Sequence, residues 1–164
     1  MVLTKLQIRQ LRCLIDVQLD LAPGLNLIVG PNGAGKSSIV EAVHLLGYGR
    51  SFRGRVGDGV IRTGATHLEV YAEWLDRNQQ THRAGLRHAG SSWEARLDGA
   101  SAPSLTELCA QIAVVTFEPG SHDLIAGGAE HRRRYLDWGL FHVEPDFLPQ
   151  WRRYARALKQ RNTL

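Results

Sequence analysis

The feature that most constrains this chain is a glycine-rich segment that lies between a short apolar run and an amphipathic helix. Residues Gly30 to Ser37 read G-P-N-G-A-G-K-S and match the pattern G-x-x-x-x-G-K-S/T in full. Glycines let successive backbone N–H groups turn toward one centre, where a Cβ atom would obstruct a bound anion. The lysine of this pattern reaches the β- and γ-phosphates of a nucleotide, and the hydroxyl binds Mg²⁺. The segment therefore predicts a phosphate-binding loop.

The flanking residues supply the context that this pattern requires. Residues 25–29, Leu-Asn-Leu-Ile-Val, are long enough for a buried strand and too short for a helix. Residues 37–46 place Ile39, Val43 and Leu46 on one helical face, and Gly47 is expected to end that helix. The positive end of the helix dipole would add to the anion site. The order strand, glycine loop, helix indicates nucleotide binding.

The rest of the chain alternates between strand and helix patterns. Alternating apolar and polar residues predict strands over residues 3–11 and 17–21, and antiparallel strands over residues 67–97 that lead to an Asp98-Gly99 turn. A capping box at residues 104–107 opens a short helix, and residues 112–117 are a second candidate for a buried strand. Two helices are expected over residues 130–141 and from residue 147 toward residue 158.

Composition excludes several classes of protein. With 164 residues, 43% hydrophobic and 22% charged, the chain has the size and composition of about one folded domain. Cys13 and Cys109 fit neither a disulfide framework nor a metal-ligand spacing, as expected of a cytoplasmic protein. No apolar run approaches the ~20 residues of a membrane span, and the first residues do not resemble a signal peptide. The net charge of +4 is compatible with nucleic acid but does not show it.

Longer stretches of the sequence resemble a known family. The GTPase patterns D-x-x-G and N-K-x-D do not occur, and the loop comes after an antiparallel pair, as in the ABC-type ATPase heads that include the SMC group. Residues 4–12, 49–53 and 127–139 are similar to the RecF family of DNA repair proteins, and the most specific is G-G-x-x-x-R-R-x-x-L-D-W-G in residues 127–139. The resemblance covers the whole chain.

This resemblance implies a fold and a function. The fold would be α/β, a P-loop NTPase with an ABC/SMC-like ATPase head. A mixed sheet with an antiparallel β subdomain would occupy residues 1–128, and residues 129–164 would begin a helical second lobe. The implied function is ATP-binding DNA repair and replication. Such a protein binds single-stranded and duplex DNA, acts with RecO and RecR to load RecA at gaps, and supports the SOS response. The full-length parent would form an ATP-dependent homodimer in the cytoplasm, without a membrane partner.

Site residues follow from the loop, the resemblance and the charges. ATP and Mg²⁺ are the expected cofactors, with Ser37 as the metal ligand and Arg12 near the nucleotide. The residues expected to hold the triphosphate are Gly30, Pro31, Asn32, Gly33, Ala34, Gly35, Lys36, Ser37 and Ser38. Basic side chains suit DNA phosphates without reading sequence. The arginines expected to bind DNA are Arg50, Arg53, Arg55, Arg132, Arg133 and Arg134.

The sequence also departs from the family. Heads of this type need a signature motif of the L-S-x-G-Q kind and a Walker B strand that ends in Asp-Glu, and neither pattern occurs. Residues 114–118 resemble Walker B superficially but lack the aspartate. The chain therefore resembles an N-terminal fragment, and no catalytic residue is assigned, although the family has a weak DNA-dependent ATPase. A small P-loop kinase and a non-catalytic nucleotide-binding interaction module are the alternatives.

Overall fold

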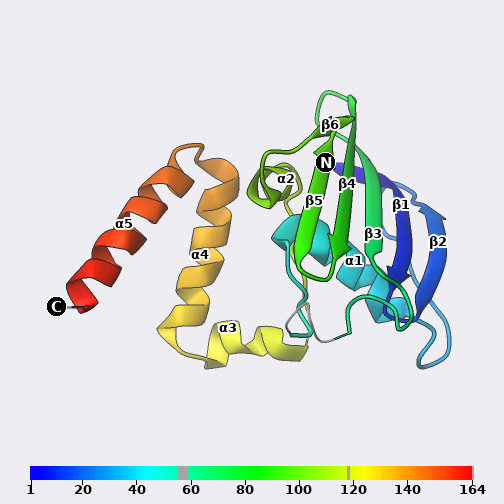
Figure 1. Cartoon of the computed structure of the whole chain (residues 1–164), viewed down its shortest axis with the longest axis horizontal. Coiled ribbons are helices and arrows are strands. Elements are labelled where there is room, and N and C mark those ends of the chain that lie inside the picture. The colour runs from blue at the N-terminus through cyan, green and yellow to red at the C-terminus, as the bar shows by residue number, and fades with distance from the viewer. Residues whose placement is uncertain (55–58, 118, 164) are drawn as a thin grey trace. The chain divides into compact units, whose positions relative to one another are not determined.

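A six-stranded antiparallel sheet frames the N-terminal part of the chain (Figure 1). The computed structural model describes residues 1–54, 59–117 and 119–163, in two units, Met1–Val115 and Thr116–Leu164. The strands lie in the order β2-β1-β3-β4-β5-β6, so that β1 pairs with both β2 and β3. Their bounds are β1 Val2–Leu11, β2 Leu14–Asp20, β3 Leu68–Leu75, β4 Thr81–Ala89, β5 Ser92–Leu97 and β6 Ala100–Ser101.

The alternating residues predicted β1 to β5, whereas the two-residue β6 was not predicted. Along β3, each second side chain is buried, from Leu68 to Trp74. The turn at Asp98 and Gly99 is also confirmed: both residues have positive φ, 49° and 85°, as a tight hairpin turn requires. One face of the sheet is therefore apolar, and the other carries charged side chains.

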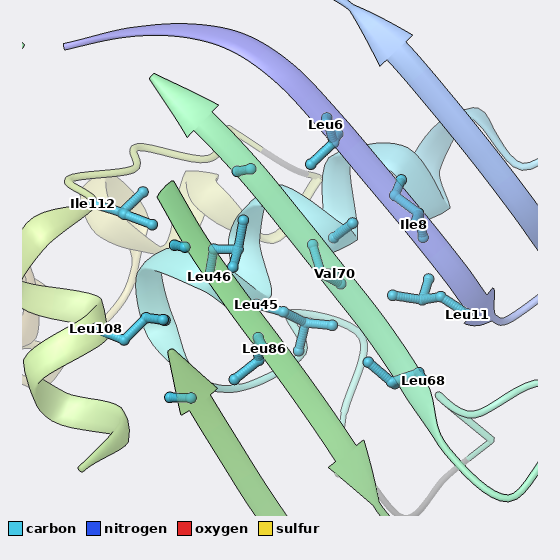
Figure 2. Packing of buried hydrophobic residues seen from close by; sticks show 14 of the residues in the cluster. Leu6, Ile8, Leu11, Leu45, Leu46, Leu68, Val70, Leu86, Leu108 and Ile112 are labelled. Atoms are coloured by element: carbon cyan, nitrogen blue, oxygen red, sulfur yellow. The ribbon is translucent and has the colours of Figure 1, made fainter. Parts of the chain in front are cut away.

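Two helices cover the apolar face (Figure 2). Helix α1 spans Lys36–Tyr48 and contributes Leu45 and Leu46 to the core, and α2 spans Leu105–Gln111 and contributes Leu108. The predicted capping box starts α2, because the Ser104 hydroxyl accepts a hydrogen bond of 3.3 Å from the Glu107 N–H. The core thus lies between the sheet and the helix that follows the glycine loop.

The prediction that Gly47 ends α1 is wrong. The helix continues to Tyr48, and Gly49 caps it in the left-handed conformation, at φ 63°, with its N–H donating to Leu45 O at 2.8 Å. Gly47 lies inside the helix, where a Cβ atom would meet Val114 Cγ2 at 2.6 Å. The glycine is therefore explained by close packing and not by helix termination.

Two predicted buried strands are also absent. Residues 25–29 and 112–117 are irregular, and apart from the buried Ile112 and the partly buried Val114 their apolar side chains are largely accessible, with Leu25 92%, Leu27 82% and Phe117 86% exposed. A strand needs a neighbour for its backbone hydrogen bonds, and no strand among the described residues pairs with either segment. The sheet of this chain is accordingly antiparallel throughout the described part.

The second unit consists of short and long helices. Its elements are the 3₁₀ helix η1 Pro119–His122, α3 Asp123–Ala126, α4 Ala129–Val143 and α5 Phe147–Asn162. The two long helices confirm the predictions from periodicity, and Trp151 Nε1 of α5 donates to Asp137 Oδ2 of α4 at 3.2 Å. None of the described helices is long and apolar enough to cross a membrane. The predicted division after residue 128 stays a prediction.

Packing at Gly47 leads to a test of the fold. Gly47→Ala should lower the free energy of unfolding by about 1 kcal/mol, because an overpacking cost of about 1–3 kcal/mol outweighs a helix-propensity gain of about 1 kcal/mol. Gly139→Ala in α4 is the control, since a Cβ there meets nothing within 4 Å, and it should stabilise its helix. Urea denaturation followed by circular dichroism measures both, and a stabilised Gly47→Ala would contradict the packing account.

Candidate nucleotide-binding site

The glycine loop leads directly into α1, and two of its glycines have backbone conformations that other residues rarely adopt. Gly33 and Gly35 have φ values of 84° and 94°. A Cβ atom on Gly35 would also lie 2.5 Å from Leu14 Cδ2, so glycine is required there for space as well as for conformation. Gly35 is the N-cap of α1 and supplies no side-chain cap, and the first turn holds no acidic residue. No acidic side chain of the first turn therefore competes with an anion for the N–H groups at this helix end, and an anion site requires such N–H groups.

The Lys36 side chain folds back over the loop. Its ammonium donates hydrogen bonds of 2.8 Å to Gly30 O and to Pro31 O. The structure thus brings together three of the predicted site residues, with a cation at the mouth of the glycine turn. The next two residues differ in accessibility: Ser37 is exposed, whereas Ser38 is buried. Ser37 is therefore the hydroxyl that a metal ion could reach.

The turn between β1 and β2 lies beside the loop. Cys13 Sγ is 3.8 Å from Gly33 O, and Leu14 packs closely on Gly35. The Arg62 guanidinium donates to Cys13 O at 3.0 Å and so ties this turn to the chain beyond residue 59. The shape of the loop consequently depends on where the β1–β2 turn is held.

A buried carboxylate holds that turn. Glu41 of α1 is 0% exposed and accepts two hydrogen bonds from Arg12, at 3.2 Å from Nε and 2.9 Å from Nη2. Ser51 Oγ donates to Glu41 Oε1 at 2.5 Å, and Arg53 Nε lies 3.8 Å from Oε2. One carboxylate therefore joins α1, the β1–β2 turn and the segment that follows α1.

Competing effects set the pKa of Glu41. Burial raises the pKa, but the hydrogen bonds from Arg12 and Ser51 and the charges of Arg12 and Arg53 lower it, and the net result is a pKa below the ordinary value of 4.5. Glu41 is therefore ionised at neutral pH, and it neutralises the guanidinium that pairs with it. Sequence reasoning does not identify Glu41, because two positions after Ile39 it falls on the opposite side of a helix from the predicted apolar face of Ile39, Val43 and Leu46.

Aromatic packing fixes the segment after α1. His44 stacks on Tyr48 with ring centroids 4.2 Å apart and meets the Phe52 ring edge-on at 5.2 Å. Burial, together with the nearby charge of Arg50, lowers the pKa of His44 to about 4, so the ring is neutral at physiological pH. Residues 51–53 are thus held against the helix, while the Arg50 side chain is exposed.

The predicted DNA-binding arginines fall into different environments. Arg53 pairs with Glu41, and Arg55 lies outside the described residues, as does Glu118 of the Walker B-like stretch. In α4, Arg132 donates to Gly127 O at 2.9 Å and Arg134 pairs with Glu130 one turn away. Arg133 makes no hydrogen bond or ion pair with any residue that the structure describes. The three consecutive arginines therefore have different local partners, and their binding to DNA stays a prediction.

A glycine loop that opens a helix beneath an antiparallel sheet defines a P-loop nucleotide-binding head. A family model described as an AAA domain matches residues 5–87 of this chain. The DNA replication and repair protein RecF of Xanthomonas euvesicatoria pv. vesicatoria is 62% identical over 98% of this chain and 45% of that protein. RecF of Vibrio vulnificus is 38% identical over 100% of this chain and 46% of that protein. The chain belongs to the AAA-domain family, and over nearly its whole length it is similar to these RecF proteins of DNA replication and repair.

Solved structures show the same similarity. The structure of the recombination mediator protein RecF-ATPrS in the RecFOR pathway matches with a TM-score of 0.86 and 26% identity, over 99% of this chain and 44% of that chain. An SMC head domain from Thermotoga maritima matches with a TM-score of 0.52 and 19% identity, over 66% of this chain and 41% of that chain, which shows the fold alone. The predicted α/β ATPase-head class is therefore confirmed. This chain spans a little less than half the length of its curated relatives.

The buried carboxylate gives a pH-dependent prediction. Glu41→Gln should lower the free energy of unfolding by about 3–5 kcal/mol at pH 7, because it removes the buried negative charge that pairs with Arg12. A carboxyl whose folded pKa is lowered stabilises above the unfolded pKa and loses that contribution as pH falls through the folded value. The difference between the wild type and the variant should therefore be constant above about pH 5.5 and shrink below pH 4.5.

Glu69→Gln is the matched control for this measurement. Glu69 lies on the solvent-facing side of β3, is 39% exposed and pairs with Arg9 and Arg87 at 3.8 and 3.7 Å. Its removal should cost at most about 1 kcal/mol, as is usual for exposed ion pairs. Urea midpoints between pH 4 and pH 8 compare the two variants, and equal losses would contradict the structural role of Glu41.

Proposed function

We propose that this chain carries the ATP-binding part of a RecF-type protein of DNA replication and repair. The observation that carries the proposal is the position of the Lys36 ammonium. It donates hydrogen bonds of 2.8 Å to Gly30 O and Pro31 O, at the glycine turn that opens α1. The similarity to RecF-ATPrS and RecF-ATP structures supports the choice of nucleotide. It also favours a repair protein over a small P-loop kinase.

The residues present fit a nucleotide with its metal ion. The N–H groups of residues 33–37 and the Lys36 ammonium would hold the β- and γ-phosphates, in a cradle where Gly35 leaves no room for a Cβ atom. The exposed Ser37 hydroxyl would bind Mg²⁺, which supplies charge neutralisation for the phosphates when bound. Arg12 would act on the nucleotide indirectly, since Glu41 already holds two of its N–H groups.

The partners that we propose follow from the RecF relatives. The protein would bind single-stranded and duplex DNA, act with RecO and RecR in loading RecA at gaps, form an ATP-dependent homodimer and work in the cytoplasm. The matching structures belong to the recombination mediator RecF in the RecFOR pathway, which supports this choice. Among the arginines predicted from sequence, the exposed Arg50 and Arg133 are the best placed for DNA phosphates.

The nucleotide site is tested by removing its cation. Lys36→Ala should weaken ATP binding by about 10- to 100-fold, because a charge-assisted hydrogen bond contributes about 1.5–3 kcal/mol. Lys5→Ala, a lysine of β1, should leave the affinity unchanged. Titration calorimetry with ATP and Mg²⁺ measures both variants, and an unchanged affinity for Lys36→Ala would contradict the site.

The two cysteines provide an independent measurement of occupancy. Cys13 is exposed beside the loop, whereas Cys109 is buried and burial raises its pKa to about 11. A thiol reagent at pH 7.5 should therefore modify Cys13 alone, since the thiolate is the reactive form. ATP with Mg²⁺ should slow this reaction in the wild type and not in Lys36→Ala. Mass spectrometry of the labelled peptides follows it, and equal rates with and without ATP would place the nucleotide elsewhere.

A further inference from the structure

Helix α5 is strongly basic over its whole length. Its sixteen residues, Phe147–Asn162, contain five basic side chains and no acidic one. The basic residues are Arg152, Arg153, Arg156, Lys159 and Arg161. All five are exposed. None of them was among the arginines expected to bind DNA from the sequence.

Three of these cations form one ridge. Arg152, Arg156 and Lys159 are spaced i, i+4 and i+7, which places them on the same face of the helix. They are about 6 Å and about 4.5 Å apart along the axis, at 1.5 Å per residue. The apolar residues follow another face, where Trp151 is tied to Asp137 of α4. The ridge is therefore not the face that packs in the helical hairpin.

The residues that the structure describes do not neutralise this ridge. Among the described residues, no carboxylate lies within ion-pair distance of Arg152, Arg156 or Lys159, and Arg156 Nε only donates to Arg152 O at 3.3 Å. Like charges at i and i+4 destabilise a helix. The helix dipole favours Lys159 and Arg161 in the last turn, but it does not favour Arg152 in the second turn.

We propose that Arg152, Arg156 and Lys159 bind the phosphate backbone of duplex DNA. The inference rests on the DNA partner of the proposed function. Each strand of duplex DNA carries one phosphate per about 3.4 Å of axis, so a ridge of about 10 Å spans about three phosphate intervals. Ammonium and guanidinium groups contact phosphate oxygens without reading base edges. Binding through the ridge is accordingly independent of sequence and sensitive to salt.

The test removes the three charges together. In the protein with Arg152→Gln, Arg156→Gln and Lys159→Gln, the slope of log K against log salt should fall by up to about 2.7, at about 0.9 per phosphate contact on duplex DNA. Affinity at 0.1 M salt should fall by up to about 500-fold, which is the same change in slope applied over one decade of salt. Fluorescence anisotropy on a labelled duplex from 50 to 300 mM NaCl measures both. Glutamine is a good helix former, and circular dichroism checks that α5 remains helical.

A matched variant removes the same net charge elsewhere. Arg9→Gln, Arg83→Gln and Arg87→Gln remove three arginines of the sheet, each of which pairs with a carboxylate. This control should keep most of the wild-type slope. A further variant, R152K/R156K, turns the ridge into three lysines, and it should retain DNA binding because only the charge is required.

Each remaining outcome overturns the proposal in a recognisable way. If the ridge variant keeps the wild-type slope and affinity, α5 is a solvated helix and DNA binds elsewhere. If the sheet variant loses as much as the ridge variant, only net charge matters. If the wild type binds ATP but no DNA at 50 mM NaCl, the DNA part of the proposed function fails together with the ridge. If the ridge variant loses binding to phosphatidylserine vesicles but not to DNA, the partner is a membrane surface.

Discussion

The pairing of Arg12 with the buried Glu41 carboxylate is the interaction on which the position of the glycine loop depends. A carboxylate with no exposed surface is stable only when it is paired and hydrogen-bonded, and here Arg12, Ser51 and Arg53 do both. Glu41 lies on the helix that begins at the loop, and Arg12 lies in the turn that packs against it. The same contact therefore sets the helix, the turn and the loop relative to one another.

Local signals predicted much of the fold from the sequence. The alternation of β3, the capping residue Ser104 and the G-x-x-x-x-G-K-S pattern each depend on neighbours within a few residues, and the structure shows the expected element in each case. Lys36 was predicted for the same reason, because the pattern itself places it at the glycine turn. What these features share is that the chain near the residue determines its conformation.

Features that depend on distant residues were not predictable in this way. An apolar run such as residues 25–29 indicates a preference for burial, but it does not say which segment would lie against it, and in this structure Leu25 and Leu27 remain exposed. Gly47 follows the local rule for a helix end, yet its contact with Val114 decides its role. Glu41 is read as an ordinary helix residue until Arg12, 29 positions earlier, is placed beside it.

The basic side chains of the two units differ in whether carboxylates pair with them. Near the loop, Glu41 pairs with Arg12 and Arg53 and offsets one of their two positive charges, whereas the backbone N–H groups and Lys36 lie at the glycine turn itself. On α5, the cations stand in a row without carboxylates. A compact triphosphate needs donors that converge on one point, whereas a long polyanion needs charges spaced along a line. Salt screens the second kind of attraction more than the first, so nucleotide binding and DNA binding by this protein would respond differently to ionic strength.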